Sequence, residues 1–143
     1  MTPVVANIRD EWYWVKDGIN EILQQFYWFD YRAEDVYAAC VNGSAILYKT
    51  EEGFAVFTIE ANTLTKENSF LCWLAWGKPE YKGNLIASHF DFFLEQSRDY
   101  GCERISVKTA IDGLDKFLVD QGWRVDMRVF SYDVGNGPEQ IEE

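Results

Sequence analysis

The chain has 143 residues, of which 48% are hydrophobic and 17% aromatic, and its formal net charge is −11. This length and composition predict one domain with a substantial core and exclude an intrinsically disordered protein. The acidity excludes direct binding of nucleic acid through clustered Lys and Arg, because that affinity comes from neutralising phosphates. An acidic surface attracts cationic partners, although its simplest effect is solubility.

Cysteine and histidine are too few and too scattered to predict a metal site. Cys40, Cys72 and Cys102 are odd in number and far apart, and His89 is the only histidine. Free thiols in this pattern are typical of the reducing cytosol. The sequence does not begin with a signal-peptide pattern, and no apolar run approaches ~20 residues. We therefore expect a cytoplasmic protein that does not contact a membrane.

The first third of the chain predicts a short strand and two helices. The strand spans Val4 to Ile8, and an amphipathic helix follows from Asp10 to Phe26. Ala33 to Val41 predicts a second helix, which the pair Asn42-Gly43 ends. The apolar face of the first helix consists of Trp12, Val15, Ile19, Ile22, Leu23 and Phe26.

The loop between these two helices is unusually aromatic. Within five positions it contains Tyr27, Trp28, Phe29 and Tyr31. Loops this rich in rings either pack back between the helices or touch a partner. We predict that these rings, together with Trp14, form a surface for a protein partner or an acceptor substrate, and packing between the helices is the alternative.

Three strands and a strand–helix–strand unit follow. The strands span Ser44 to Thr50, Phe54 to Ala61 and Phe70 to Trp76, and the third is apolar on both faces. Asn84 is the expected N-cap of a helix that ends before Gly101. Cys102 to Lys108 alternates and predicts a further strand, so Ala75 to Ala110 reads as a βαβ-type unit.

The C-terminal part predicts a helix and a strand. The helix spans Asp112 to Gln121, and Trp123 to Val134 alternates as a long strand or a bent pair of strands. Residues 135–143 are rich in Gly, Pro and Glu, as in a flexible acidic tail. The sequence thus predicts a single domain over residues 1–134.

The run Pro79-Glu80-Tyr81-Lys82-Gly83-Asn84-Leu85-Ile86-Ala87 resembles the acyl-CoA loop of the GNAT superfamily of N-acetyltransferases. In that loop a proline and an aromatic residue precede a basic residue, and Gly-x-Gly-x-Gly/Ala then opens a helix. Lys82, Gly83 and Ala87 match this pattern, whereas Leu85 replaces its central glycine. A second stretch, Gly113 to Trp123, is similar to the family helix that closes on a Gly-Phe pair. The resemblance covers about residues 10–134.

This resemblance implies an α/β fold, with a mixed, mostly antiparallel twisted sheet and helices on both faces. It also implies acetyl-CoA or coenzyme A as cofactor, without a metal, because amides at a helix N-terminus bind a pyrophosphate. If the Leu85 side chain points into the core, binding survives weakly, and if it points at the anion, binding is lost. The implied cofactor residues are Gly77, Lys82, Gly83, Asn84, Leu85, Ile86 and Ala87.

The catalytic residues that the resemblance implies are missing from their usual places. Many family members use a carboxylate on or near the fourth strand as base, but Phe70 to Trp76 contains none. Leu118 stands where the usual acid, a tyrosine, is expected. The catalytic residues thus stay unknown, and the remaining candidates are Glu60, Glu67 and Glu80 as base and Tyr100 and Tyr132 as acid.

Two functions follow from the resemblance. One is an acyl-CoA-dependent N-acyltransferase that acetylates a cationic amine. The other is a catalytically inactive GNAT-fold module that binds a protein partner through the aromatic loop. Small phage-encoded GNAT-like proteins, some of them virion components, look similar to this chain, and this likeness implies the host cytoplasm or the virion as its location.

Overall fold

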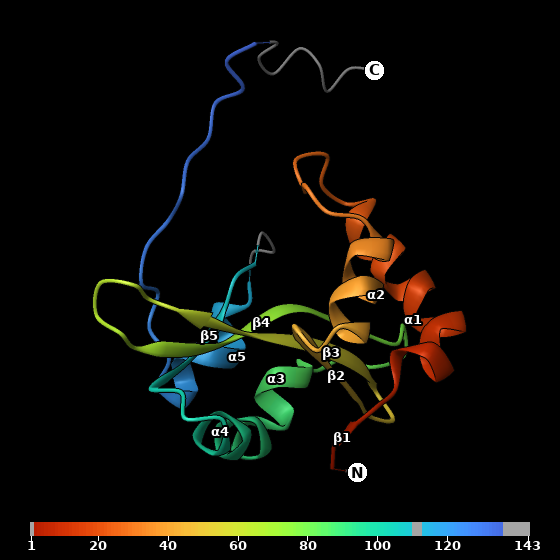
Figure 1. Cartoon of the computed structure of the whole chain (residues 1–143), viewed down its shortest axis with the longest axis horizontal. Coiled ribbons are helices and arrows are strands. Elements are labelled where there is room, and N and C mark those ends of the chain that lie inside the picture. The colour runs from red at the N-terminus through yellow and green to blue at the C-terminus, as the bar shows by residue number, and fades with distance from the viewer. Residues whose placement is uncertain (1, 110–112, 136–143) are drawn as a thin grey trace.

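The computed structural model describes residues 2–109 and 113–135, which form one five-stranded sheet with flanking helices (Figure 1). The strands lie in the order β1-β2-β3-β4-β5. The first three pairings are antiparallel, and β4 pairs with β5 in parallel. The strands are β1 (Val4–Val5), β2 (Ala45–Lys49), β3 (Gly53–Ala61), β4 (Asn68–Gly77) and β5 (Arg104–Val107).

Helices cover both faces of this sheet. Figure 1 shows α1 and α2 on one face and α3 and α4 on the other. A short C-terminal helical segment follows β5 in the chain. The helices are α1 (Ile8–Leu23), α2 (Ala33–Val41), α3 (Leu85–Ser88), α4 (Phe90–Asp99), α5 (Asp115–Leu118) and the 3-10 turn η1 (Val119–Gln121).

The first core lies between the sheet and the pair α1 and α2. Val15 and Ile19 of α1 are fully buried against this face, with Phe54 of β3. Gly18 lets α1 approach closely, because a Cβ there would lie 2.7 Å from the Phe54 ring and 2.9 Å from that of Trp76. The position of α1 against the strands therefore depends on this glycine.

The second core lies on the opposite face, under α3 and α4. The Phe57 ring stacks on Phe70 at 4.5 Å and on Phe93 of α4 at 4.8 Å between centroids. The buried Tyr48 hydroxyl donates a hydrogen bond of 2.8 Å to Oε1 of Gln96. Burial on both faces explains why β3 is apolar at alternate and intervening positions.

Most of the predicted elements are confirmed with small shifts at their ends. The helix at Ala33–Val41 has the predicted bounds, while α1 begins at Ile8 because the Asn7 side chain accepts the amide of Arg9. The helix predicted after Asn84 is divided at His89, whose backbone angles are φ −117° and ψ 31°. Residues 110–112 and 136–143, with the start of the predicted last helix and most of the tail, lie outside the described residues.

The strand predicted from Trp123 to Val134 is wrong. Residues 123–133 are extended but are not part of the sheet. Alternation predicts which side chains share a face, but a strand forms only where its backbone finds a neighbouring strand. In this structure the segment leaves the body of the protein instead (Figure 1).

Candidate functional site

The strands β4 and β5 pair along only part of their length. Their register begins at Ser69 with Arg104 and ends at Cys72 with Val107. Beyond Cys72, β4 continues for five residues to Gly77 without β5 beside it. A gap therefore opens in the sheet along the C-terminal half of β4.

A bulge in β4 marks the beginning of this gap. On β3, the adjacent residues Val56 and Phe57 pair with Leu74 and Cys72, so the register skips Trp73. A bulge re-aims the side chain and leaves a backbone group of the extra residue outside the ladder. The bulged Trp73 thus follows directly on the last residue that pairs with β5.

Tyr31, from the loop between α1 and α2, lies against this bulge. Its ring centroid is 5.3 Å from that of Trp73, and Phe29 stacks on it at 5.8 Å. Burial raises the pKa of Tyr31, and the nearby Asp30 and Cys72 raise it further. Like an unperturbed tyrosine, whose pKa is about 10, Tyr31 is therefore protonated at neutral pH.

The turn after β4 lies at the other end of the gap. The amide of Lys78 donates to the carbonyl of Glu52 at 2.7 Å, which fixes the turn to the β2–β3 hairpin. Oδ1 of Asn84 then accepts the amide of Ala87 at 3.0 Å, which confirms the predicted N-cap. The first amides of a helix have no partner within the helix, which here applies to those of Leu85 and Ile86.

The Leu85 side chain is buried in the core beneath this turn. Its exposed fraction is 4%, and it packs in the second core with Ile86. A small cavity of about 220 Å³ borders the turn, and its lining consists of Ala75, Trp76, Gly77, Tyr81, Gly83, Asn84 and Leu85. Leu85 thus packs in the core and also lines the cavity at the turn, and its effect on cofactor binding stays a prediction.

Comparison with known proteins supports this geometry at the level of the fold. No family model matches the chain, and no curated protein matches its sequence. Solved structures of acetyltransferases match over most of both chains. A putative acetyl transferase from Pyrococcus furiosus has a TM-score of 0.69 at 12% identity, covering 92% of this chain and 99% of that chain.

Two further solved structures agree. A ribosomal-protein-alanine N-acetyltransferase from Brucella melitensis has a TM-score of 0.68 at 9% identity, with 93% and 99% of the two chains covered. A predicted acetyltransferase from Clostridium acetobutylicum, determined with acetyl-CoA, has a TM-score of 0.66 at 9% identity, with 92% and 95% covered. This chain has the GNAT fold. The fold class predicted from the sequence is therefore confirmed.

In this GNAT fold, the predicted cofactor residues gather only in part. Gly77, Gly83, Asn84 and Leu85 border the small cavity at the turn. The side chain of Ile86 is buried in the second core, and Lys82 is exposed on the turn. Their role in binding a cofactor stays a prediction.

Tyr81 is a part of this turn that the sequence did not single out as functional. Its hydroxyl shares a hydrogen bond with that of Ser88, and its ring lies over two glycines. A Cβ at Gly83 would lie 2.7 Å from the Tyr81 hydroxyl, and one at Gly77 3.1 Å from the ring. Both glycines thus make room for Tyr81, a contact that a sequence motif does not reveal.

The carboxylates considered as base do not converge on the bulge. Glu60 accepts a hydrogen bond from Lys108 at 3.4 Å, and Glu67 one from Arg104 at 3.2 Å. Glu60 is paired with Ser69, at the end of β4 where β5 is still present. Glu80 is exposed in the turn. None of these three is placed by its contacts as a general base.

The tyrosines considered as acid lie elsewhere too. Tyr100 stacks on Phe70 at 5.7 Å, in the part of β4 that is paired with β5. Tyr132 is 74% exposed on the extended C-terminal segment. Leu118 is buried, where the family tyrosine was expected. Tyr31, which the sequence assigned to a partner or acceptor surface, is the tyrosine beside the bulge.

The aromatic loop is exposed only at its tip. The exposed fractions of Tyr27 and Trp28 are 53% and 55%, whereas Phe29 and Tyr31 are partly buried. The prediction that Trp14 is an exposed part of this surface is wrong. Its indole donates to Glu11 at 2.7 Å and its ring packs edge-on against Phe54, because it lies on the inner side of α1.

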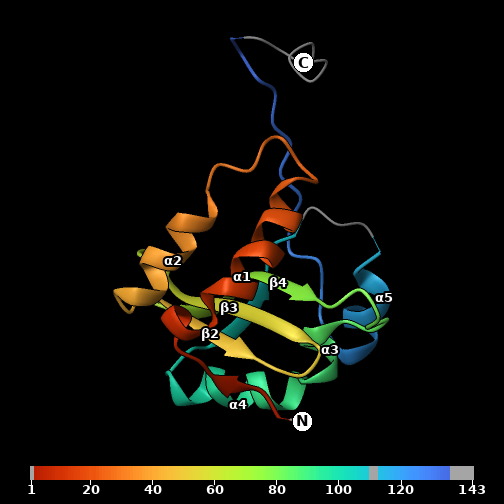
Figure 2. The same cartoon turned by 90° about the vertical axis from the view of Figure 1, so that its right-hand side faces the viewer.

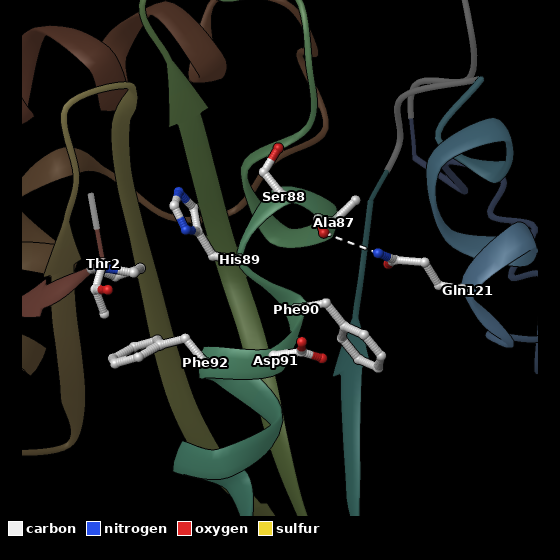
Figure 3. A pocket seen from close by; sticks show the side chains of 9 residues that line it. Thr2, Ala87, Ser88, His89, Phe90, Asp91, Phe92 and Gln121 are labelled. Carbon is white, nitrogen blue, oxygen red and sulfur yellow. Dashed lines mark hydrogen bonds between the residues drawn. The ribbon is translucent and has the colours of Figure 1, made fainter.

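A second hollow lies at the break between α3 and α4 (Figure 3). It has a volume of about 350 Å³, with Thr2 on one side and Gln121 on the other. Nε2 of His89 lies 3.1 Å from Oε1 of Glu52, and this hydrogen bond lowers the pKa of Glu52. The His89 side chain at the break between α3 and α4 is therefore hydrogen-bonded.

Two further searches concern metals and membranes. Within residues 2–109 and 113–135, His, Cys, Asp and Glu side chains form no group of three that could hold a metal ion. No helix among the described residues is long and apolar enough to cross a membrane.

Proposed function

We propose that this chain binds acetyl-CoA in the gap beside β4 and transfers the acetyl group to an amine. The observation that carries the proposal is the alignment of three features along one strand. The parallel pairing ends at Cys72, the bulge follows at Trp73, and the capped turn begins after Gly77. A long, thin ligand with an anionic end fits such a gap.

The turn would hold the anionic end of the cofactor. The amides of Leu85 and Ile86 and the helix dipole favour a pyrophosphate, and Lys82 adds a positive charge. Because Leu85 is buried in the core, its bulk does not oppose a phosphate. The bound cofactor would supply the acyl thioester.

Tyr31 and Trp73 would serve the reacting end. A backbone amide that the bulge leaves outside the ladder is suited to donate a hydrogen bond to the acyl oxygen. When an amine nitrogen forms its bond to the acyl carbon and the carbon–sulfur bond breaks, the thiolate needs a proton. Tyr31 is the protonated side chain beside the bulge, and we assign it this role. The acceptor ammonium would lose two protons: the first would pass to solvent before the attack, and the second, from the attacking nitrogen, would restore the proton that Tyr31 gives to the thiolate.

A cationic amine is the acceptor that the charge of the chain favours. The net charge is −11, and Asp30 is an exposed residue of the aromatic loop, close in sequence to the exposed Tyr27 and Trp28. Acidic surfaces steer cations toward a site and raise the rate of encounter.

The alternative function is a binding module without catalysis, for example a virion-associated phage protein. The absence of a carboxylate from β4 and the exposed rings of Tyr27 and Trp28 favour it. Exposed aromatic residues are frequent hot spots of protein interfaces. In that case the gap would be a remnant of the fold.

Calorimetric titration with acetyl-CoA and with free coenzyme A separates the two functions. The variants are Lys82→Glu at the turn and, as a matched control, Lys16→Glu on the exposed side of α1. We expect binding by the wild type and the control and at least tenfold weaker binding by Lys82→Glu. If the wild type binds neither ligand at millimolar concentration, the proposed enzyme function is excluded and the binding module is the function that remains.

A further inference from the structure

Residues 123–134 form an extended arm that leaves the body of the protein (Figure 1). Large apolar side chains recur along it at nearly every second position. The exposed fractions of five of them, between Met127 and Val134, range from 74% to 93%. An alternating apolar segment in water has the composition of a strand but lacks its sheet.

The arm is held at both ends, away from the sheet of its own chain. At its base, the amide of Trp123 donates to the carbonyl of Leu118 at 3.3 Å, and its ring lies 5.5 Å from that of Phe90. Near its far end, the Tyr27 hydroxyl donates to Asp133 at 3.0 Å. Figures 1 and 2 show the arm and the loop between α1 and α2 extending from the same side of the body. Beyond Trp123, the backbone of the arm makes no backbone hydrogen bond within the part of the chain that the structure describes, so it can pair with another strand.

The strand β5 is an edge of the sheet that the structure describes. It pairs with β4 on one side, and no other described strand lies on its second side. An edge strand presents unpaired amides and carbonyls and thus accepts a further strand. The arm thus has the pattern of a strand but no neighbouring strand, and β5 has an unpaired side that a strand can join.

The charges near these two segments allow two acidic chains to approach one another. The arm contains two Arg and two Asp, so its formal charge is zero in a chain with a net charge of −11. Arg104 and Lys108, at the ends of β5, are paired with Glu67 and Glu60. Repulsion between like charges is therefore weakest here.

The base of the arm contains a further unfinished contact. The indole Nε1 of Trp123 is buried without an acceptor among the described residues. Buried donors in complete structures are almost always paired. A second chain that packs against the base of the arm would supply the missing acceptor.

We propose that the arm of one copy of this chain pairs with the β5 edge of a second copy. A two-fold axis makes the exchange reciprocal, so that both edges and both arms are covered at once. Such an exchange needs an arm that already extends from its own body, as this one does. The proposal does not depend on whether the chain binds acetyl-CoA.

Sedimentation and hydrogen exchange test the dimer. The arm variant Met127→Lys/Val129→Lys changes two exposed side chains, so it does not disturb the core. Its matched control is Leu64→Lys, in the β3–β4 loop, where the side chain is 90% exposed. We expect twice the chain mass for the wild type and the control, and the single-chain mass for the arm variant.

Amides of residues 104–107 and of the arm should exchange slowly in the wild type and at least tenfold faster in the arm variant. A wild type with the single-chain mass at its highest soluble concentration would overturn the proposal, whether or not β5 is protected by its own arm. A dimer that the arm variant leaves intact would overturn it too, since another surface would then hold the copies together.

Discussion

Tyr31 lies against Trp73 with their ring centroids 5.3 Å apart, and Trp73 is the residue that the register between β3 and β4 skips. A loop between two helices thus places a tyrosine ring beside the point where the pairing of β4 with β5 ends. Burial raises the pKa of Tyr31, and the hydroxyl is protonated at neutral pH, as it is in an unperturbed tyrosine.

The first prediction concerns this hydroxyl. Tyr31→Phe keeps the ring and its contact with Trp73 but removes the proton donor. We expect kcat for acetyl transfer to fall roughly 100-fold or more, with little change in the affinity for acetyl-CoA. The matched control is Tyr37→Phe, whose ring packs on Trp12 at 4.8 Å. Equal kcat values for the wild type and Tyr31→Phe would exclude Tyr31 as the acid.

The second prediction concerns Leu85, which replaces the central glycine of the family loop. Because Leu85 is buried, Leu85→Ala should lower the free energy of unfolding by about 2–5 kcal/mol through the cavity that it leaves. It should not strengthen acetyl-CoA binding, because the Leu85 side chain is buried in the core. Urea unfolding and calorimetric titration measure the two effects, and Leu64→Ala, at an exposed position, is the control. Tighter binding by Leu85→Ala would show that the leucine does obstruct the cofactor.

Much of the fold could be predicted because its signals are local. The apolar face of α1, the N-cap at Asn84 and the glycine after α4 each depend on a few neighbouring residues. The prediction of a strand from Trp123 to Val134, where the structure has the arm, was wrong for the complementary reason. The alternation is a true property of the sequence, but pairing requires a neighbouring strand that the pattern does not specify.

The site was less predictable, because its parts meet through tertiary contacts. The bulge at Trp73 depends on the register between β3 and β4, which an evenly apolar strand leaves undefined. Tyr31 reaches it from a loop more than forty positions away in the chain. The sequence did indicate an aromatic loop, but it offered no signal to separate the partly buried Tyr31 from the exposed Trp28.

The third prediction concerns the close approach of α1 to the sheet. Gly18→Ala improves helix propensity by about 1 kcal/mol, yet its Cβ would lie 2.7 Å from the Phe54 ring. We expect a net loss of about 1–3 kcal/mol of stability, because the buried rings must shift. Asp17→Ala, at the neighbouring exposed position, gains propensity without a clash. In chemical unfolding, we expect the free energy of unfolding to fall for Gly18→Ala and to rise for Asp17→Ala. A Gly18→Ala variant more stable than the wild type would contradict the packing described for α1.

The fourth prediction concerns the pH dependence of stability at the pair of Glu11 and Lys49. The Lys49 ammonium donates to Glu11 at 2.7 Å, and the Trp14 indole donates to the other carboxylate oxygen at 2.7 Å. These bonds lower the pKa of Glu11, the Lys49 bond most. A carboxyl group whose pKa is lower in the folded state stabilises the fold above its unfolded pKa of about 4.3.

That contribution is lost as the pH falls from about 4.3 through the lower pKa of the folded state. Glu11→Gln should therefore be less stable than the wild type by about 1 kcal/mol at pH 7, and the difference should shrink toward pH 3. Glu95→Gln is the matched control, because its partner Arg98 lies 3.8 Å away and both side chains are exposed. Urea unfolding at pH 7, 5 and 3 makes the comparison, using the roughly linear dependence on denaturant. A difference that stays constant across this range would show that packing of the Glu11 side chain, rather than its charge, stabilises this end of α1.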